Sequence, residues 1–176
     1  MRVDFLLDLR EKSAFGAVAQ IAPHYHLHDC VVPRTKLVEV LTGVYAIAKR
    51  HDLIVTNVFH AGDGNLHPLL SFDRSVPGTL ERVLEASDDI VRLCVDAGGA
   101  LSGEHGIGLE KRDFMPLVFT AEDLAAQACV RDSFDPDHRM NPQKVLPAGA
   151  RCGDFAMMRG SDAAEAAADL PEGSWI

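Results

Sequence analysis

The chain has 176 residues, of which 47% are hydrophobic and 24% are charged, as in an ordinary globular domain with its own core. Its formal charge of −9 argues against nucleic-acid binding, because phosphate recognition needs clustered lysine and arginine. No apolar run reaches the roughly 20 residues that span a bilayer, and the acidic N-terminus is unlike a signal peptide. The four cysteines form no CxxC pair, so we expect a reduced, cytoplasmic protein.

Periodicity predicts four elements in the first third of the chain. An alanine-rich helix is expected over 10–22 and a strand over 24–32, each ended by a proline. A helix capped by Thr35 is expected to run to about Arg50, with its apolar residues on one face. The β-branched segment 53–59 predicts the next strand.

The following segments predict a hairpin and two more helices. A second hairpin strand is expected over 65–72, and apolar residues at helical spacing predict a helix over 80–98. The pattern Thr-Ala-Glu-Asp predicts a capping box that opens a helix over 120–134. Because helices alternate with strands and one strand pair is a tight hairpin, we predict an α+β fold. Its sheet would be partly antiparallel, with helices packed on one face, and a doubly wound parallel sheet is the alternative.

The hairpin carries two histidines that flank an Asp-Gly turn. If Asp63 and Gly64 are the two turn residues, His60 lies directly opposite His67, with Cβ atoms about 4.5–5.5 Å apart. One metal ion could bridge two imidazoles in that position. An exposed histidine pair without a metal is the competing interpretation, and spacing alone weighs the two about equally.

A second segment, 98–108, contains five glycines and is too glycine-rich for a regular element. It also contains Glu104 and His105. With His60 and His67, Glu104 would complete a set of two histidines and one carboxylate, which leaves an open position on zinc, iron or manganese. A solvated Glu104 is the alternative, and HExxH and GxGxxG motifs are both absent.

Three further histidines alternate at His24, His26 and His28. On a strand they would share one face and could chelate a metal ion. Alternation more often means only that one face of a strand is buried. The neighbours Tyr25 and Leu27 suit the buried face, so we expect the histidine face to be solvated.

The two central motifs together resemble the C-terminal domain of FAD-linked oxidases of the vanillyl-alcohol-oxidase type. The nearest resemblance is to the glycolate oxidase large subunit and to the D-lactate and D-2-hydroxyglutarate dehydrogenases. The matching segments are HAGDGNLHP at 60–68, GGALSGEHGIGLEKR at 98–112, DCVVPR at 29–34, FDP at 134–136 and NPQKV at 141–145. The resemblance implies an α+β fold with ferredoxin-like elements.

The resemblance also implies roles for individual residues. His60, His67 and Glu104 match the ligands of the family's divalent metal, for which we expect zinc, and His105 matches the proposed general base. The metal would lower the pKa of the substrate hydroxyl, and an imidazole with an ordinary pKa of about 6.5 suits the base. Arg10 resembles the arginine that holds the substrate carboxylate, and Asn141 lies in the segment that approaches the flavin.

The family's flavin-binding domain precedes the matching region and is not in this sequence. We therefore expect an N-terminally truncated FAD-linked oxidase C-terminal domain over 1–152, followed by a flexible tail over 153–176. Its expected function is to bind a 2-hydroxy acid and a metal ion for an FAD-dependent dehydrogenase that makes a 2-oxo acid. Expected partners are the small substrate and a separate flavin-domain chain or iron–sulfur subunit, and a homo-oligomer is left open. The alternatives are a stand-alone metal-binding module and a non-catalytic remnant.

Overall fold

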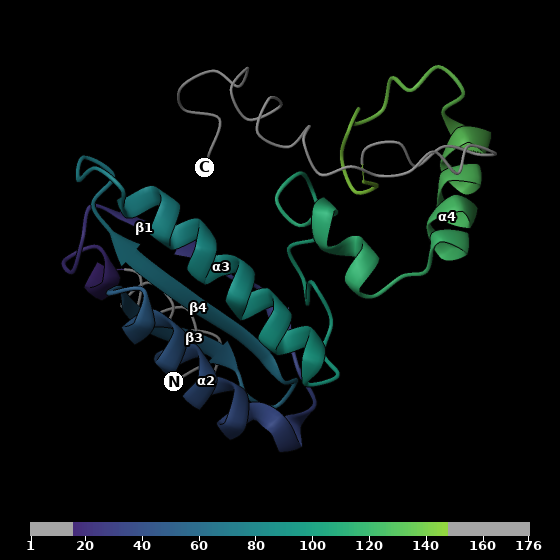
Figure 1. The fold of residues 1–176 in the computed structure, drawn as a ribbon. Helices are drawn as coiled ribbons and strands as arrows, with labels where there is room; N and C mark the ends of the chain where they lie inside the picture. The colour runs from purple at the N-terminus through teal and green to yellow at the C-terminus, as the bar shows by residue number, and fades with distance from the viewer. Residues whose placement is uncertain (1–15, 148–176) are drawn as a thin grey trace, which may run out of the picture. The chain divides into compact units, whose positions relative to one another are not determined.

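The computed structural model of the chain describes residues 16–147. These form two compact units, one ending at His105 and the other beginning at Gly106 (Figure 1). Residues 10–15 of the helix predicted over 10–22 and the whole tail predicted over 153–176 lie outside the described residues. Of residues 16–22, only 16–18 are helical, so the predicted helix ends earlier than expected.

The first unit is built on an antiparallel sheet whose central strand is β4 (Asn65–Phe72). β3 (Ile54–His60) pairs along one side of β4. β1 (His24–Leu27) and β2 (Cys30–Val31) follow one another along the other side. All these pairings are antiparallel, which confirms the predicted α+β class and rules out the doubly wound alternative for the described residues.

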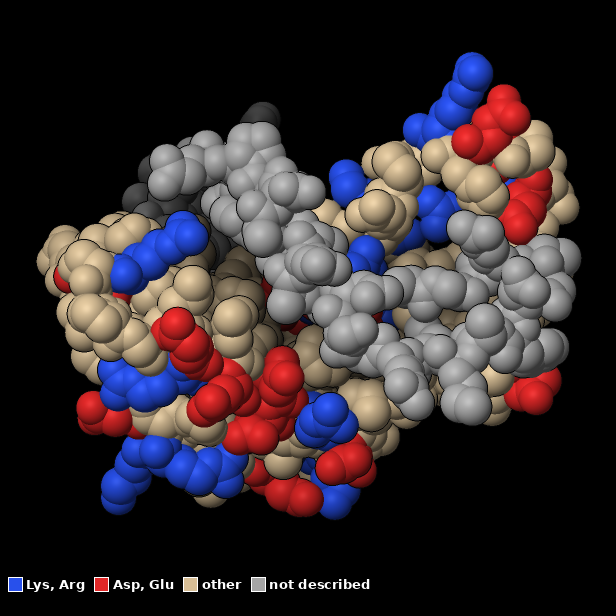
Figure 2. Space-filling view, turned by 45° about the horizontal axis from the view of Figure 1, so that its top comes forward, with Lys and Arg blue, Asp and Glu red and all other residues tan. Residues whose placement is uncertain are grey.

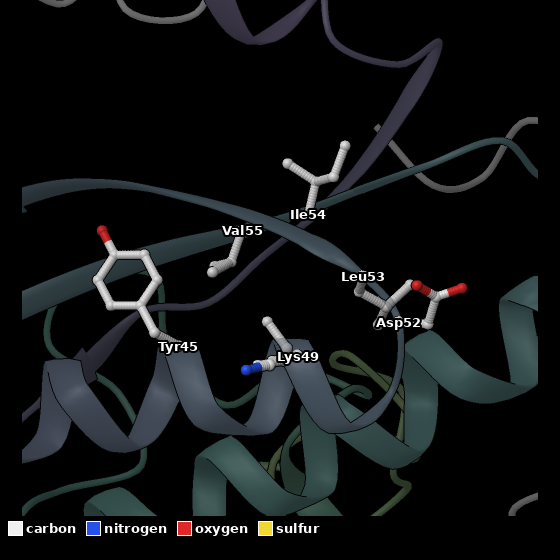
Figure 3. A pocket seen from close by; sticks show the side chains of 7 residues that line it. Tyr45, Lys49, Asp52, Leu53, Ile54 and Val55 are labelled. Carbon is white, nitrogen blue, oxygen red and sulfur yellow. The ribbon is translucent and has the colours of Figure 1, made fainter.

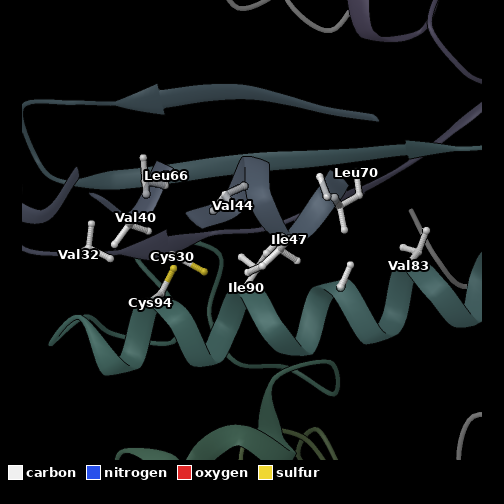
Figure 4. Close-up of a cluster of buried hydrophobic side chains, with 12 residues drawn as sticks. Cys30, Val32, Val40, Val44, Ile47, Leu66, Leu70, Val83, Ile90 and Cys94 are labelled. Carbon is white, nitrogen blue, oxygen red and sulfur yellow. The ribbon is translucent and has the colours of Figure 1, made fainter. Parts of the chain in front are cut away.

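Two amphipathic helices, α2 (Leu37–Arg50) and α3 (Thr79–Asp96), pack on the same face of this sheet (Figures 1 and 4). The core between them contains side chains from both helices and from the strands. They are Cys30, Val32, Val40, Val44, Ile47, Ala48, Leu66, Leu70, Val83, Ala86, Ile90 and Cys94. A short 3-10 helix, η1 (Arg34–Lys36), precedes α2. Thr35 lies inside η1 and no side chain caps α2, so the predicted Thr35 cap is wrong.

Two of the three alternating histidines, His26 and His28, lie toward the helices rather than in solvent. Their sheet partners include Phe72 and Leu70, which pack on the core side. His24 is exposed, but His28 is buried and the Nε2 atom of His26 lies 3.2 Å from Ser87 Oγ on α3. The expectation of a solvated histidine face is therefore wrong, because these positions belong to the covered face of the sheet.

The second unit contains a 3-10 helix, η2 (Arg112–Leu117), and α4 (Ala121–Phe134). Thr120 begins α4 with the predicted capping box: its side chain accepts from the Asp123 amide, and the Asp123 carboxylate accepts from the Thr120 amide. Cys129 on this helix is disulfide-bonded, so the expectation of a fully reduced chain is wrong.

The surface carries charges of both signs. Acidic and basic side chains are interspersed on the face shown in Figure 2. Ion pairs among the described residues include Arg50–Asp89 and Arg82–Asp52. None of the helices in the described part of the chain is both long enough and apolar enough to cross a membrane.

Candidate active site

The connection between β3 and β4 has more residues than the Asp-Gly pair predicts. His60 pairs with Asn65, so four residues connect the strands instead of two. The connection is closed by hydrogen bonds from the Asp63 amide to the His60 carbonyl at 3.0 Å and from the Gly64 amide to the Ala61 carbonyl at 3.4 Å. Gly64 has a φ of +75°, and its carbonyl accepts a hydrogen bond from the Val32 amide at 3.0 Å. The predicted direct pairing of His60 with His67 is therefore wrong.

His60 and His67 nevertheless share one face of the sheet. His67 lies two residues along β4 from the partner of His60, and residues two apart on a strand point the same way. Their ring centroids are 5.5 Å apart, with the ring planes at 89°. Leu66 and Leu70, which join the core, alternate with His67, so the histidines lie on the face opposite the helices.

Glu104 meets both histidines from the glycine-rich segment. Its Oε1 atom lies 3.1 Å from His67 Nε2 and 3.8 Å from His60 Nε2. These three residues form one of two groups among the described residues whose potential ligand atoms all lie within 4.8 Å of one another. The structure thus brings together the three residues that the sequence predicts as metal ligands.

The ring of His67 is oriented by a hydrogen bond that depends on its neighbour Pro68. β1 and β2 pair with β4 in the same register, so His28, which lies between them, stands opposite Pro68. The His28 amide donates a hydrogen bond to the Pro68 carbonyl at 2.9 Å. Proline has no N–H to donate in return. The His28 carbonyl instead accepts a hydrogen bond from His67 Nδ1 at 3.1 Å. Because a carbonyl only accepts, Nδ1 carries a proton, and Nε2 is the ring nitrogen that faces Glu104.

Asp29 holds the segment that carries Glu104 and His105. It is fully buried, and its Oδ2 atom accepts hydrogen bonds from Ser102 Oγ at 2.6 Å and from three consecutive amides. The amide distances are 3.0 Å for Gly103, 3.1 Å for Glu104 and 2.8 Å for His105. Sequence patterns do not mark Asp29 as a site residue. The available signal is a carboxylate inside a predicted strand, where a charge needs partners.

His105 lies beside the three candidate ligands. Its ring stacks on His67 with centroids 5.2 Å apart, and its Nε2 atom is 3.6 Å from Glu104 Oε1. The His67 side chain is 8% exposed, against 51% for Glu104 and 46% for His105. The site is therefore closed around His67 and accessible to a small molecule beside Glu104 and His105.

A second possible ligand group consists of Asp29, His67 and His105. It shares His67 with the first group, so the two are alternatives around one position. The Oδ2 atom of Asp29 already accepts hydrogen bonds from a hydroxyl and three amides. The group with His60 and Glu104 is consequently the better candidate for a metal ion.

The structure does not place the other two predicted site residues relative to this cluster. Arg10 lies outside the described residues. Asn141 belongs to the second unit and is exposed. Its φ is +46°, and its carbonyl accepts a hydrogen bond from Arg131 Nη2 at 2.8 Å.

A surface depression elsewhere in the first unit contains none of the site residues. It lies between the end of α2 and the start of β3, and its lining includes Tyr45, Lys49 and Ile54 (Figure 3). Its position separates it from the histidines and Glu104, and it offers no second imidazole or carboxylate cluster of its own.

Comparison with known proteins identifies the family of this chain. The family model for FAD linked oxidases, C-terminal domain, matches residues 4–145, which include both central motifs. This chain belongs to that family. The FAD linked oxidase domain described here is 45% identical over 147 residues to the glycolate oxidase subunit GlcD of Escherichia coli (strain K12). It is 33% identical over 147 residues to GlcD of Bacillus subtilis (strain 168). The mitochondrial D-lactate dehydrogenase [cytochrome] of Kluyveromyces lactis is 30% identical over 118 residues.

These matches cover most of this chain but a small part of each relative. The alignment with the Escherichia coli protein covers 84% of the chain and 30% of that protein, and the Bacillus subtilis figures are 84% and 31%. For the yeast dehydrogenase they are 67% and 20%. The FAD linked oxidase domain thus spans about a third or less of the relatives it matches.

Proposed function

We propose that this domain binds the substrate and a metal ion for an FAD-dependent dehydrogenase that converts a 2-hydroxy acid to a 2-oxo acid. The convergence of His60, His67 and Glu104 next to His105 carries the proposal. The names of the relatives, glycolate oxidase subunit and D-lactate dehydrogenase, favour a small 2-hydroxy acid such as glycolate or D-lactate. Family membership supports FAD as the redox cofactor.

The side chains of the site fit a divalent metal ion. Two imidazoles and one carboxylate are a donor set that proteins use for zinc, iron and manganese, with positions left for substrate or water. Because the Nδ1 proton of His67 is held by the His28 carbonyl, Nε2 is the ring nitrogen that would bind the ion. An ion held by His60, His67 and Glu104 would act as a Lewis acid toward the substrate hydroxyl. We propose this metal site without assigning the metal.

We assign the proton transfer to His105. Its Nε2 atom lies beside the carboxylate of Glu104 and on the accessible side of the site. A hydroxyl bound next to Glu104 can therefore approach to hydrogen-bonding distance of His105, which accepts its proton. The electron pair left on oxygen forms the C2 carbonyl as the C2 hydride departs. FAD would accept that hydride.

The remaining assignments concern groups beyond the described cluster. We propose that Arg10 binds the substrate carboxylate and that Asn141 contacts the flavin. A flavin-binding part, on the same or another polypeptide, would supply most FAD contacts. An iron–sulfur subunit or another acceptor would then receive the electrons.

Metal binding by the purified chain tests the ligand assignment. Bound zinc, manganese and iron are measured after equilibrium dialysis for the wild type, His60→Ala and Glu104→Gln. His24→Ala is the matched control, because His24 is an exposed histidine of the same sheet outside the site. Loss of one ligand is expected to weaken binding by about tenfold or more, while the control binds like the wild type. Equal binding by all four proteins would refute the assignment.

Substrate class is tested separately with the metal-loaded chain. Calorimetry with glycolate and D-lactate is compared with 3-hydroxypropionate, which has the same two groups on carbons farther apart. We expect tighter binding of the 2-hydroxy acids and reduction of FAD when a flavin-binding domain is supplied. Equal binding of both classes, or no flavin reduction under those conditions, would contradict the proposed activity.

A further inference from the structure

Asp29 is placed by the sheet at the centre of the candidate site. β1 and β2 pair with β4 in a single register, so Asp29 stands opposite His67. Residues opposite each other in an antiparallel sheet point to the same face. The Asp29 carboxylate therefore lies on the face that carries His60 and His67, and it is fully buried there.

The hydrogen bonds of Asp29 determine the path of the backbone from Ser102 to His105. Three consecutive amides can converge on one oxygen only where the backbone curls into a concave turn, the geometry with which proteins bind anions. Here the anion is a side chain of the same chain, and the Ser102 hydroxyl adds a fourth donor. Two of the amides belong to Glu104 and His105, so the carboxylate fixes the backbone of both residues.

The position of Glu104 shows why such an anchor matters. Its side chain is about half exposed, yet Oε1 lies 3.1 Å from His67 Nε2. The segment around it contains many glycines, which lose more backbone freedom on ordering than other residues. A ligand on such a segment binds a metal ion well only if the backbone is already held in place.

We propose that Asp29 is a positioning residue, which binds neither metal nor substrate but holds Glu104 and His105 in their working positions. The part of this inference that concerns metal binding rests on the proposed function. The anchoring of the 102–105 backbone does not, because it is measurable in the metal-free chain.

The test compares Asp29→Asn with Ser102→Ala in the full chain. Asparagine has a similar size, but it presents at most one acceptor oxygen and places an NH2 group among N–H donors. In Asp29→Asn we expect the affinity for Zn²⁺ or Mn²⁺ to fall by about 10- to 100-fold, as for other residues that orient metal ligands. Ser102→Ala removes one hydroxyl and leaves the three amide bonds, so its affinity is expected to stay close to that of the wild type.

Amide hydrogen exchange in the metal-free proteins supplies the second measurement. The amides of 103–105 should exchange faster in Asp29→Asn, while those of β4 keep their protection. If Asp29→Asn does not fold, Asp29→Glu retains the charge and shifts the carboxylate by one methylene, and the same two measurements apply. Unchanged exchange at 103–105 would overturn the anchoring role.

A double-mutant cycle separates a positioning residue from a ligand. If Asp29 acts through Glu104, Asp29→Asn should cost little further affinity in a Glu104→Gln background. If Asp29 binds the metal itself, as in the alternative ligand group, the two losses should add, and the proposal is wrong. A wild-type chain that binds no metal would refute the proposed function and the metal-related part of this inference, whereas the exchange data would still decide the anchoring of 102–105.

Discussion

Replacing Gly64 by alanine is expected to destabilise the hairpin that carries His60 and His67. The φ of +75° at Gly64 lies in the left-handed region, which costs an L-residue roughly 1–2 kcal/mol. An added Cβ would also lie 2.2 Å from the carbonyl oxygen of Val32, a backbone atom that no rotamer change can remove. Relieving such overpacking costs about 1–3 kcal/mol. Together the two effects predict a loss of about 2–5 kcal/mol in the free energy of unfolding.

Gly62, in the same connection, provides the matched control. Its φ is outside the left-handed region, and a Cβ there would meet no atom within 4 Å. Gly62→Ala is therefore expected to change stability by no more than about 0.5 kcal/mol. Urea unfolding followed by circular dichroism measures both variants, with the slopes of the transitions compared to confirm two-state behaviour. If Gly64→Ala is as stable as Gly62→Ala, the assigned turn and its contact with Val32 are wrong.

Two further predictions concern the orientation of His67 and the link between α2 and α3. Pro68→Ala gives β4 an N–H that competes with His67 Nδ1 for the His28 carbonyl. Metal affinity should therefore fall by about tenfold, and the ¹⁵N chemical shifts of the His67 ring should change. Identical shifts in the variant and the wild type would contradict this account. The pKa of Asp89 is lowered, chiefly by its hydrogen bond with His51, so this carboxylate stabilises the fold above its ordinary value of 3.8 and the effect is lost as the pH falls below it. Asp89→Asn should therefore be less stable than the wild type at pH 7, by under about 1 kcal/mol. The difference should shrink as the pH falls below 3.8, which unfolding curves over a series of pH values measure.

The sequence predicts the elements of the first unit well, because local periodicity marks them. β4 matches its predicted range of 65–72, and α3 begins close to its predicted start. The fold class follows from the same pattern. Turn geometry is less predictable, since Asp63-Gly64 suits a two-residue turn locally. The structure instead has a four-residue connection, which also contacts Val32, a residue distant in the sequence.

The candidate site shows the same division between local and distant effects. The histidines and Glu104 were identifiable from residue type and motif, and the wrong register still left both imidazoles on one face because strand alternation was preserved. Asp29 was not identifiable in this way, since its four donors lie more than seventy positions along the chain. The burial of His28 likewise depends on packing of the sheet face by α2 and α3, which alternation alone does not specify.

A single proline connects these observations. Because Pro68 has no N–H, the neighbouring strand breaks into β1 and β2 at His28 and Asp29. The break gives the two residues different tasks: the His28 carbonyl orients His67, and the Asp29 carboxylate holds the backbone of Glu104. Both constraints on the candidate metal ligands thus come from the two residues at this break in the strand. It follows that Pro68→Ala and Asp29→Asn should weaken metal binding by different routes, the first through the imidazole tautomer and the second through the backbone.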